Sequence, residues 1–569
     1  MEKGSSHKQQ SFLYGTLILG VSTILVKILG AVFRIPLSNL IGSVGMGYFT
    51  TAYDIYLPIY SLAMAGLPIA VARLIAEQVA KKRYRDIKKT LKVVNATFMV
   101  TGLIGLIVMF VSALIVTGVA NNSGALPAAF VIAPSIIFCC IISVYRGYYE
   151  GIRNMYPTAI SNIIEAVCKL VLGYSFAFVA IKLYGNNENV LSVAAAAAML
   201  GITLGSVFAS IYLIIRYKKD DKNYSDVELS LSPEPQTSKQ IFKALIVIAI
   251  PVAIGSLVNN VASLIDVAMV QRQIGSAVAK NPQVFRDMYG SFLVGNNNSV
   301  LKDSEIPNFL YGCYKGYAYT IFNLVPSITV VVGVSALPVL TMAWTEGNKS
   351  AIKANIESML KVISLIAFPA GIGITALAPQ IISLLYSAED AVIAVNILRI
   401  LGLAACFAGM TTPLTNMLQA IGKPSAPVKN IAVGAIIKIV VNYILVGVPE
   451  INILGAPIGT VMCYMYIAFA DIYCLVKYSK IKPDFVKTLF KPLLAALVCG
   501  IAAYGSNALI SLVFESRIVT LLSILIAVIA YVVAIAVLRC IDEEDVNTLP
   551  KGDKLIKIFN KMGIVRTKN

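Results

Sequence analysis

Residues 518–538 read IVTLLSILIAVIAYVVAIAVL, an uncharged run of 21 residues near the carboxyl end of the chain. The hydrocarbon core of a bilayer is about 30 Å thick, and roughly 20 residues of helix cross it. Helices suit lipid because they satisfy their own backbone hydrogen bonds. Similar stretches occupy most of the sequence, which is 58% hydrophobic and only 13% charged. We therefore expect an all-α integral membrane protein.

Fourteen stretches of this kind can be placed, and little sequence remains outside them. They lie near 12–34, 48–72, 92–118, 126–147, 157–184, 190–216, 243–272, 310–343, 353–377, 391–419, 426–447, 453–477, 490–512 and 517–539. The first stretch is too long to read as a cleavable signal peptide. Because no other segment is long enough to bury a core of its own, we expect any functional site to lie among the membrane helices.

Two short stretches of sequence recur, in similar form, six spans later in the chain. Residues 52–56 (AYDIY) correspond to 318–322 (AYTIF), and 167–171 (VCKLV) correspond to 436–440 (IIKIV). In secondary transporters, parallel repeats form two lobes that rock about a central site. We therefore predict two six-helix lobes in parallel repeat plus two C-terminal helices. The predicted parts are an N-lobe at 1–217, a cytoplasmic linker at 218–242, a C-lobe at 243–480, the last two spans at 481–540 and a basic cytoplasmic tail at 541–569.

Positive charge alternates from loop to loop. Residues 81–92 contain seven lysines and arginines, whereas 120–127 and 185–190 contain none. Short cytoplasmic loops retain Lys and Arg, so we expect both termini in the cytoplasm. The net charge of +18 then reflects orientation and attraction to anionic lipid, and it gives no reason to expect nucleic-acid binding.

The histidine and cysteine content excludes several kinds of chemistry. The single histidine is His7, in the amino-terminal tail. This excludes a His-ligated metal centre, a Ser-His-Asp triad and a histidine proton relay inside the membrane. Most of the nine cysteines fall inside predicted spans without C-x-x-C spacing, as is typical of small packing residues. We expect no cofactor and no metal, so any proton or cation coupling would use a carboxylate.

Ionisable and polar residues inside the spans are the candidate site residues. An ionisable group at the bilayer centre costs about 2.5–3.5 kcal/mol on insertion scales and usually faces a cavity or a partner. The candidates are Lys27 and Arg34 in the first span, Tyr53 and Asp54 in the second, Glu165 in the fifth, Asp266 in the seventh, and Lys315 and Asn323 in the eighth. Polar groups in both predicted lobes suggest a hydrated cavity of mixed charge.

Other interpretations of these residues stay open. Glu165 and Lys169 are one turn apart, so they can form an intrahelical ion pair or contact a substrate. The long lysine and arginine side chains can instead extend to the membrane interface. Asp54 and Asp266 have no adjacent basic residue on their own helices, so each needs a partner, a proton or an ion from elsewhere.

The motifs that carry a family resemblance lie in the first half of the chain. Residues 145–151 read YRGYYEG, 154–162 read NMYPTAISN, and KILG at 27–30 precedes RIPL at 34–37. With fourteen spans in a six-plus-six-plus-two arrangement, the chain resembles the multidrug/oligosaccharidyl-lipid/polysaccharide (MOP) flippase superfamily. Within it, the chain is similar to the polysaccharide-transporter branch that includes stage V sporulation protein B. It resembles MurJ-type lipid II flippases more distantly, because those carry an Arg-Asp pair where Phe33-Arg34 stands here.

The resemblance implies a flippase of the bacterial cytoplasmic membrane. Its substrate would be an undecaprenyl-pyrophosphate-linked cell-wall or polysaccharide precursor, with lipid II among the candidates, exported by alternating access. Lysine and arginine are charge-assisted partners for a diphosphate that crosses a low-dielectric region. We expect Lys27, Arg34 and Lys315 to hold the pyrophosphate, with Tyr53 and Asn323 beside them. The expected partners are the lipid-linked precursor and membrane lipids.

Two rival functions stay open. A MATE-like drug or cation antiporter would use Asp54 or Asp266, with Glu165 as a further cavity acid, to bind H⁺ or Na⁺. A net positive cavity favours the flippase, and a net negative cavity favours the antiporter. An intramembrane glycosyltransferase is the third possibility. We do not expect an enzyme, because the exported segment 275–307 has no histidine and no paired carboxylate motif.

Overall fold

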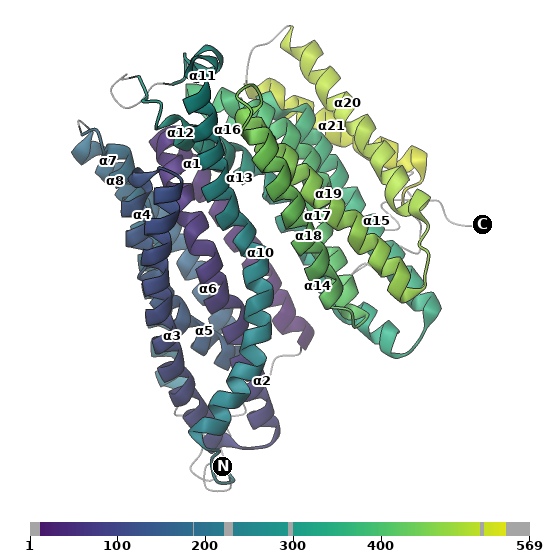
Figure 1. Ribbon diagram of the computed structural model, residues 1–569. Coiled ribbons are helices and arrows are strands. Elements are labelled where there is room, and N and C mark those ends of the chain that lie inside the picture. The colour runs from purple at the N-terminus through teal and green to yellow at the C-terminus, as the bar shows by residue number, and fades with distance from the viewer. Residues whose placement is uncertain (1–11, 186, 221–231, 294–299, 513–516, 542–569) are drawn as a thin grey trace. The chain divides into compact units, whose positions relative to one another are not determined.

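A computed structural model of the chain describes residues 12–185, 187–220, 232–293, 300–512 and 517–541. Helices joined by short turns make up these residues, and no β-strand occurs among them. Figure 1 shows the long helices running side by side in bundles. The predicted all-α membrane fold is therefore confirmed. His7, most of the predicted linker and nearly all of the predicted tail lie outside the described residues.

The described helices account for the predicted spans. Twelve described segments are long and apolar enough to cross a membrane. The first of them, Ile18–Ala80, holds 63 residues and is broken at Gly42, so it is long enough for two spans. The helix α10 (Ser238–Lys280) occupies the predicted span 243–272 in addition to these twelve. Together these segments match the fourteen predicted ranges.

The chain divides into two compact units, of which the first is Met1–Gly312. Its elements are α1 (Phe12–Ser61), η1 (Leu62–Gly66), α2 (Leu67–Ala80), α3 (Tyr84–Val119), η2 (Ser123–Ala125), α4 (Leu126–Ile132), α5 (Ser135–Gly151), α6 (Tyr156–Cys168), η3 (Lys169–Gly173), α7 (Tyr174–Tyr184), α8 (Val190–Asp220), α10, α11 (Pro282–Tyr289) and α12 (Ile306–Gly312). Apolar residues such as Val71 of α2, Phe98 of α3 and Tyr148 of α5 form one buried core.

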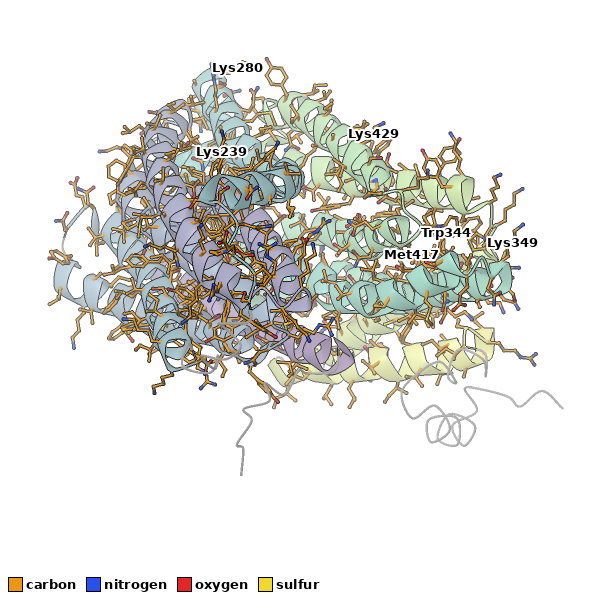
Figure 2. All side chains as sticks on the ribbon, turned by 90° about the horizontal axis from the view of Figure 1, so that it is seen from below. Lys239, Lys280, Trp344, Lys349, Met417 and Lys429 are labelled. Carbon is orange, nitrogen blue, oxygen red and sulfur yellow. The ribbon has the colours of Figure 1, made fainter. Side chains whose placement is uncertain are left out.

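The second unit is Cys313–Asn569. Its described elements are η6 (Cys313–Ala318), α13 (Tyr319–Phe322), α14 (Leu324–Thr345), α15 (Lys349–Ala376), α16 (Ala378–Leu385), η7 (Glu389–Val392), α17 (Ile393–Ala420), α18 (Ser425–Val446), η8 (Asn452–Leu454), α19 (Gly455–Ser479), η9 (Val486–Phe490), α20 (Lys491–Ser511) and α21 (Arg517–Leu538). Trp344 and Met417 belong to its core, and Lys349 is exposed at the turn between α14 and α15 (Figure 2).

Two glycines allow α12 to lie close to α1. Gly42 has φ 63° and ψ −173°, a conformation that strains other residues, and it breaks the long helix α1. At Gly47 a Cβ atom would lie 2.3 Å from the carbonyl oxygen of Asn308, so only glycine fits there. The break and the close approach together position the beginning of α12 against α1.

A buried network of polar side chains joins four parts of the first unit. Asn122, in the turn after α3, donates through Nδ2 to Gln271 Oε1 of α10 at 2.9 Å and to Asn308 Oδ1 of α12 at 2.8 Å. Gln271 Nε2 in turn donates to Thr51 Oγ1 of α1 at 2.7 Å. None of the four side chains is more than 4% exposed. Because buried polar groups require such partners, the network holds α10 and α12 within this unit.

The position of α10 differs from the predicted division into lobes. Lys239 and Lys280 mark the beginning and end of this helix in Figure 2, and it packs against α1, α2 and α3. The predicted C-lobe begins at residue 243, whereas the second unit begins at Cys313. The packing of α10 belongs to one arrangement of the helices, whereas the predicted lobe boundaries rest on two repeated stretches of sequence. The lobe boundaries therefore stay a prediction.

Two π-helical turns contain cationic residues of the spans. The turn η3 begins at Lys169, and η6 contains Lys315. A π-turn is rare and occurs frequently at functional sites, where it widens the helix locally. The backbone is therefore irregular at two of the cations that the sequence places inside the membrane.

Candidate functional site

Two cations of the first unit lie over the ring of one tyrosine. The guanidinium carbon of Arg34, on α1, is 5.3 Å from the centroid of the Tyr53 ring, and Nζ of Lys169 is 5.0 Å from the same centroid. Lys169 Nζ also lies 5.2 Å from the ring centroid of Phe33. Within the described part of the chain, no salt bridge engages Arg34 or Lys169. The aromatic rings therefore hold both cations without neutralising them.

Lys27 adds a third positive charge to this cluster. Its side chain is exposed, whereas Arg34 and Lys169 are half-buried. The charges of Lys27, Arg34 and Lys169 are close enough to repel one another. Cations held together in a low-dielectric region are stabilised by an anion between them. We call Lys27, Arg34, Lys169 and Tyr53 the cationic cluster.

The charges around Tyr53 are positive on balance. Asp54 and Glu165 are the carboxylates whose fields reach the Tyr53 hydroxyl. Arg34 and Lys169 lie over the Tyr53 ring, Lys27 acts on Lys169, and Arg146 pairs with Glu165. The charged groups linked to the cluster in this way are four cations and two carboxylates, a formal sum of +2. This balance favours an anionic ligand over an organic cation.

Glu165 forms its ion pair with Arg146 of α5. Arg146 Nη2 donates to Glu165 Oε2 at 2.6 Å, and Arg146 Nε donates to Ser161 Oγ at 2.8 Å. Ser206 Oγ donates to the other carboxylate oxygen of Glu165 at 3.2 Å. Arg146 is only 5% exposed. Glu165 therefore neutralises a buried arginine, while Lys169, one turn further along, lies against aromatic rings.

The two aspartates of the predicted site are both buried. Tyr311, on α12, donates its hydroxyl to Asp54 Oδ2 at 2.7 Å. Asp54 is 7% exposed and Asp266, on α10, is 3% exposed. The hydrogen-bond partner of Asp54 therefore comes from α12, which is distant from α1 in the sequence.

Lys315 and Asn323 belong to the second unit and differ in exposure. Lys315 is 3% exposed, and its Nζ lies 4.2 Å from the Tyr319 ring centroid and 5.5 Å from that of Tyr314. The Tyr314 hydroxyl is 3.2 Å from Thr460 Oγ1 of α19. Asn323 follows α13 and is exposed. Lys315 therefore makes cation-π contacts with tyrosine rings, as Arg34 and Lys169 do in the first unit.

Sequence reasoning left Lys169, Arg146 and Tyr311 out of the predicted site. Lys169 carried a usable signal, because a lysine inside an apolar span needs a reason to be there. Arg146 lies near the end of a predicted span, where arginines usually anchor a helix at the interface, and nothing in the sequence indicates its pairing with Glu165. Lys27, Arg34, Tyr53, Asp54 and Glu165 lie near one another within the first unit, and the cavity itself stays a prediction.

Comparisons with known proteins match the chain from end to end. The profile of the family described as "Polysaccharide biosynthesis protein" matches residues 12–344, and that of "Lipid II flippase MurJ" matches 313–522. The stage V sporulation protein B of Bacillus subtilis is 24% identical, over 96% of this chain and 99% of its own. The lipid II flippase MurJ of the same organism is 23% identical over 80% of each chain.

Solved structures share the fold at low sequence identity. A multidrug resistance MATE family transporter of the MOP superfamily, in an inward-facing conformation, superposes with a TM-score of 0.58 at 15% identity, over 81% of this chain and 99% of its own. The lipid II flippase MurJ, in an inward closed conformation, gives 0.59 at 15% identity, over 92% and 98%. The likeness agrees with the predicted all-α membrane fold.

Proposed function

Because the chain belongs to the polysaccharide biosynthesis protein family and is a membrane flippase of the MOP superfamily, we propose that it exports an undecaprenyl-pyrophosphate-linked cell-wall or polysaccharide precursor. Lipid II is one such precursor, and MurJ is named for flipping it. The proposed location is the bacterial cytoplasmic membrane, with both termini in the cytoplasm.

The observation that carries this proposal is the placement of Arg34 and Lys169 over Tyr53. A salt bridge would neutralise these cations, whereas an aromatic ring orients a cation and leaves its charge available. Arginine presents a planar fork that matches phosphate oxygens, and lysine acts as a compact point charge. The cluster therefore offers a pyrophosphate both kinds of donor. Lys27, whose side chain is exposed, adds a third charge, and the contacts of Lys315 and Asn323 with the pyrophosphate stay a prediction.

In the proposed cycle the headgroup enters from the cytoplasmic leaflet, the predicted lobes rock about it, and the lipid tail stays in the bilayer. Differential affinity between inward and outward states supplies the drive. A negative-inside membrane potential assists outward movement of an anion by about 2.3 kcal/mol per charge per 100 mV.

The carboxylates give less support to a drug or cation antiporter. Asp54 accepts a hydrogen bond from Tyr311, and Glu165 is bonded to both Arg146 and Ser206. A carboxylate that already accepts from such partners has fewer lone pairs left for a drug or an ion. The positive balance around Tyr53 opposes an organic cation further. We therefore rank the flippase above the antiporter.

Binding of a defined lipid tests the proposal directly. The full-length protein in lipid nanodiscs would be titrated with undecaprenyl pyrophosphate and followed by native mass spectrometry. Arg34→Ala and Lys169→Ala should each weaken binding about 10-fold or more, because each removes a charge-assisted hydrogen bond. Lys182→Ala is the matched control, since Lys182 is exposed in the same predicted span as Lys169.

The outcomes separate the two transporter functions. Undecaprenyl monophosphate should bind more weakly than the pyrophosphate, because it offers less charge to the cluster. Equal binding of wild type and both alanine variants would contradict the proposed site. Binding of a lipophilic cation in competition with protons, with no binding of the pyrophosphate lipid, would favour the antiporter instead.

A further inference from the structure

Asp471 is a buried carboxylate outside the cationic cluster. It lies in α19 and is 0% exposed. Asn430 of α18 donates its Nδ2 to Asp471 Oδ1 at 2.7 Å. The other carboxylate oxygen, Oδ2, is buried and has no hydrogen-bond partner among the described residues. One oxygen of this side chain is therefore satisfied and the other is not.

The surroundings of Asp471 supply no counter-charge. Its neighbours Ala468 and Leu475 belong to the apolar core of the second unit, and Asn430 also contacts Cys474 Sγ at 3.6 Å. The elements packed most closely against α19 are α17, α18 and η8, and η6, α13 and the turn before α18 also contact it. The basic residues of these elements and of α19 itself are Arg399, Lys423, Lys429 and Lys477, which are exposed, Lys438, which is half-buried two turns from Asn430, and Lys315, which is buried against the Tyr319 ring. The other titratable groups of these elements are Cys313, Tyr314, Tyr317, Tyr319, Cys406, Tyr443, Cys463, Tyr464, Tyr466, Tyr473, Cys474 and Tyr478.

An ionised carboxylate in such a place is costly, because it has lost water and gained no positive partner. Buried acids of this kind keep a proton instead. A protonated carboxyl group costs less here, since its carbonyl oxygen can still accept from Asn430 and no net charge is buried. The arrangement of partners therefore matches the neutral acid better than the anion.

We propose that Asp471 is a proton-binding site of the second unit. In the packed arrangement of α18 and α19 the carboxyl group holds its proton. When water reaches the contact between these helices, the group transfers that proton to water and becomes a carboxylate. Binding and release of a proton thereby couple to the packing of α19 against α18. The inference does not depend on the identity of the transported lipid.

A metal ion fits this place less well than a proton. Hard cations such as Mg²⁺ and Ca²⁺ are held by several oxygen ligands. Here Asn430 presents its amide nitrogen to Asp471, and the described residues contain no group of three His, Cys, Asp or Glu side chains that could hold a metal. The chemistry available at Asp471 is therefore the transfer of one proton.

Infrared spectroscopy of the purified full-length protein tests this inference, because a protonated carboxyl group has a C=O band distinct from that of a carboxylate. Wild type at neutral pH should show a band of this kind from Asp471, and this band should shift when H₂O is replaced by D₂O. Asp471→Asn should lose this band. Asp287→Asn should keep it, because Asp287 is exposed on α11 and accepts only an exposed hydrogen bond from Gln283.

A titration of the wild type keeps the test independent of any variant. The band should disappear in a single protonation step as the pH is raised, and addition of Na⁺ should leave it unchanged. Absence of the band at neutral pH would overturn the proposal, as would its persistence in Asp471→Asn. Loss of the band on addition of Na⁺ at constant pH would instead assign the site to a cation.

Discussion

Lys169 Nζ lies 5.0 Å from the ring centroid of Tyr53, although the two residues come from helices more than a hundred positions apart in the chain. The same ring lies beneath Arg34, which shares α1 with it. Tyr53 therefore fixes the positions of two cations relative to each other. This relationship makes the cluster a preorganised site for an anion, because the ring orders the side chains before the ligand arrives.

The ring of Tyr53, more than its hydroxyl, should matter for lipid binding. Tyr53→Phe should bind undecaprenyl pyrophosphate nearly as wild type does. Tyr53→Leu removes the aromatic face and should weaken binding about threefold or more, since exposed cation-π contacts are worth about 0.5–1 kcal/mol. Native mass spectrometry in nanodiscs measures both. If Phe and Leu at this position are equally harmful, the hydroxyl carries the effect and the cation-π account is wrong.

The pair of Arg146 and Glu165 should be structural. Glu165→Gln leaves a buried guanidinium without its counter-charge, which costs about 3 kcal/mol or more in a buried pair. The midpoint of thermal unfolding should fall clearly below that of wild type. The double change Arg146→Met with Glu165→Met should recover part of the loss, because no unpaired charge remains. An unchanged midpoint in the Gln variant would show that water already solvates Arg146.

The hydrogen bond from Tyr311 to Asp54 should stabilise the contact of α12 with α1. Tyr311→Phe removes a donor from a buried carboxylate, and hydrogen bonds to charged groups contribute about 1.5–3 kcal/mol. The thermal midpoint should therefore fall. Tyr473→Phe is the control, because Tyr473 is 66% exposed on α19 and should show no change. Equal midpoints for the two variants would contradict this role of Tyr311.

Asp86 should hold the end of the linker that precedes α10. Its side chain is 0% exposed, forms an ion pair with Arg83, and accepts from the backbone nitrogen of Gln236 at 2.6 Å. Asp86→Ala should release residues 232–237, and limited proteolysis there should speed up about 10-fold, because cleavage follows the population of the open form. Glu77→Ala removes only an exposed ion pair and should leave cleavage unchanged. Equal rates would show that the linker is held elsewhere.

Much of the fold could be predicted from the sequence because the bilayer imposes one requirement on every span. Apolar runs such as 518–538 and 190–216 reappear as α21 and α8 with ends that shift by a few residues. Pairings between helices follow no such local rule. Tyr311 and Asp54 are 257 positions apart, so no periodicity could join them. The sequence identifies the candidate site residues as ionisable or polar groups inside predicted spans. The residues that these groups contact can be identified only from the three-dimensional structure.

Asp471 shows a second limit of pattern reasoning. It lies in the predicted span 453–477, and an acid inside a span is a signal by itself. It is nevertheless absent from the candidate residues predicted from the sequence. Its partner Asn430 is on α18, and only packing brings the two together. A single acidic residue inside a predicted span is therefore a candidate site residue, even without polar neighbours on its own helix.

The measurement that tests the central claim most directly follows lipid-linked precursors on each leaflet of the host membrane after the protein is depleted. The rescue copies would be wild type, Arg34→Ala, Lys169→Ala and the control Lys182→Ala, at matched expression. We predict that precursors accumulate on the inner leaflet, and that wild type and the Lys182 variant restore export while the other two do not. An unchanged leaflet distribution on depletion, accompanied by sensitivity to cationic drugs, would contradict the flippase account.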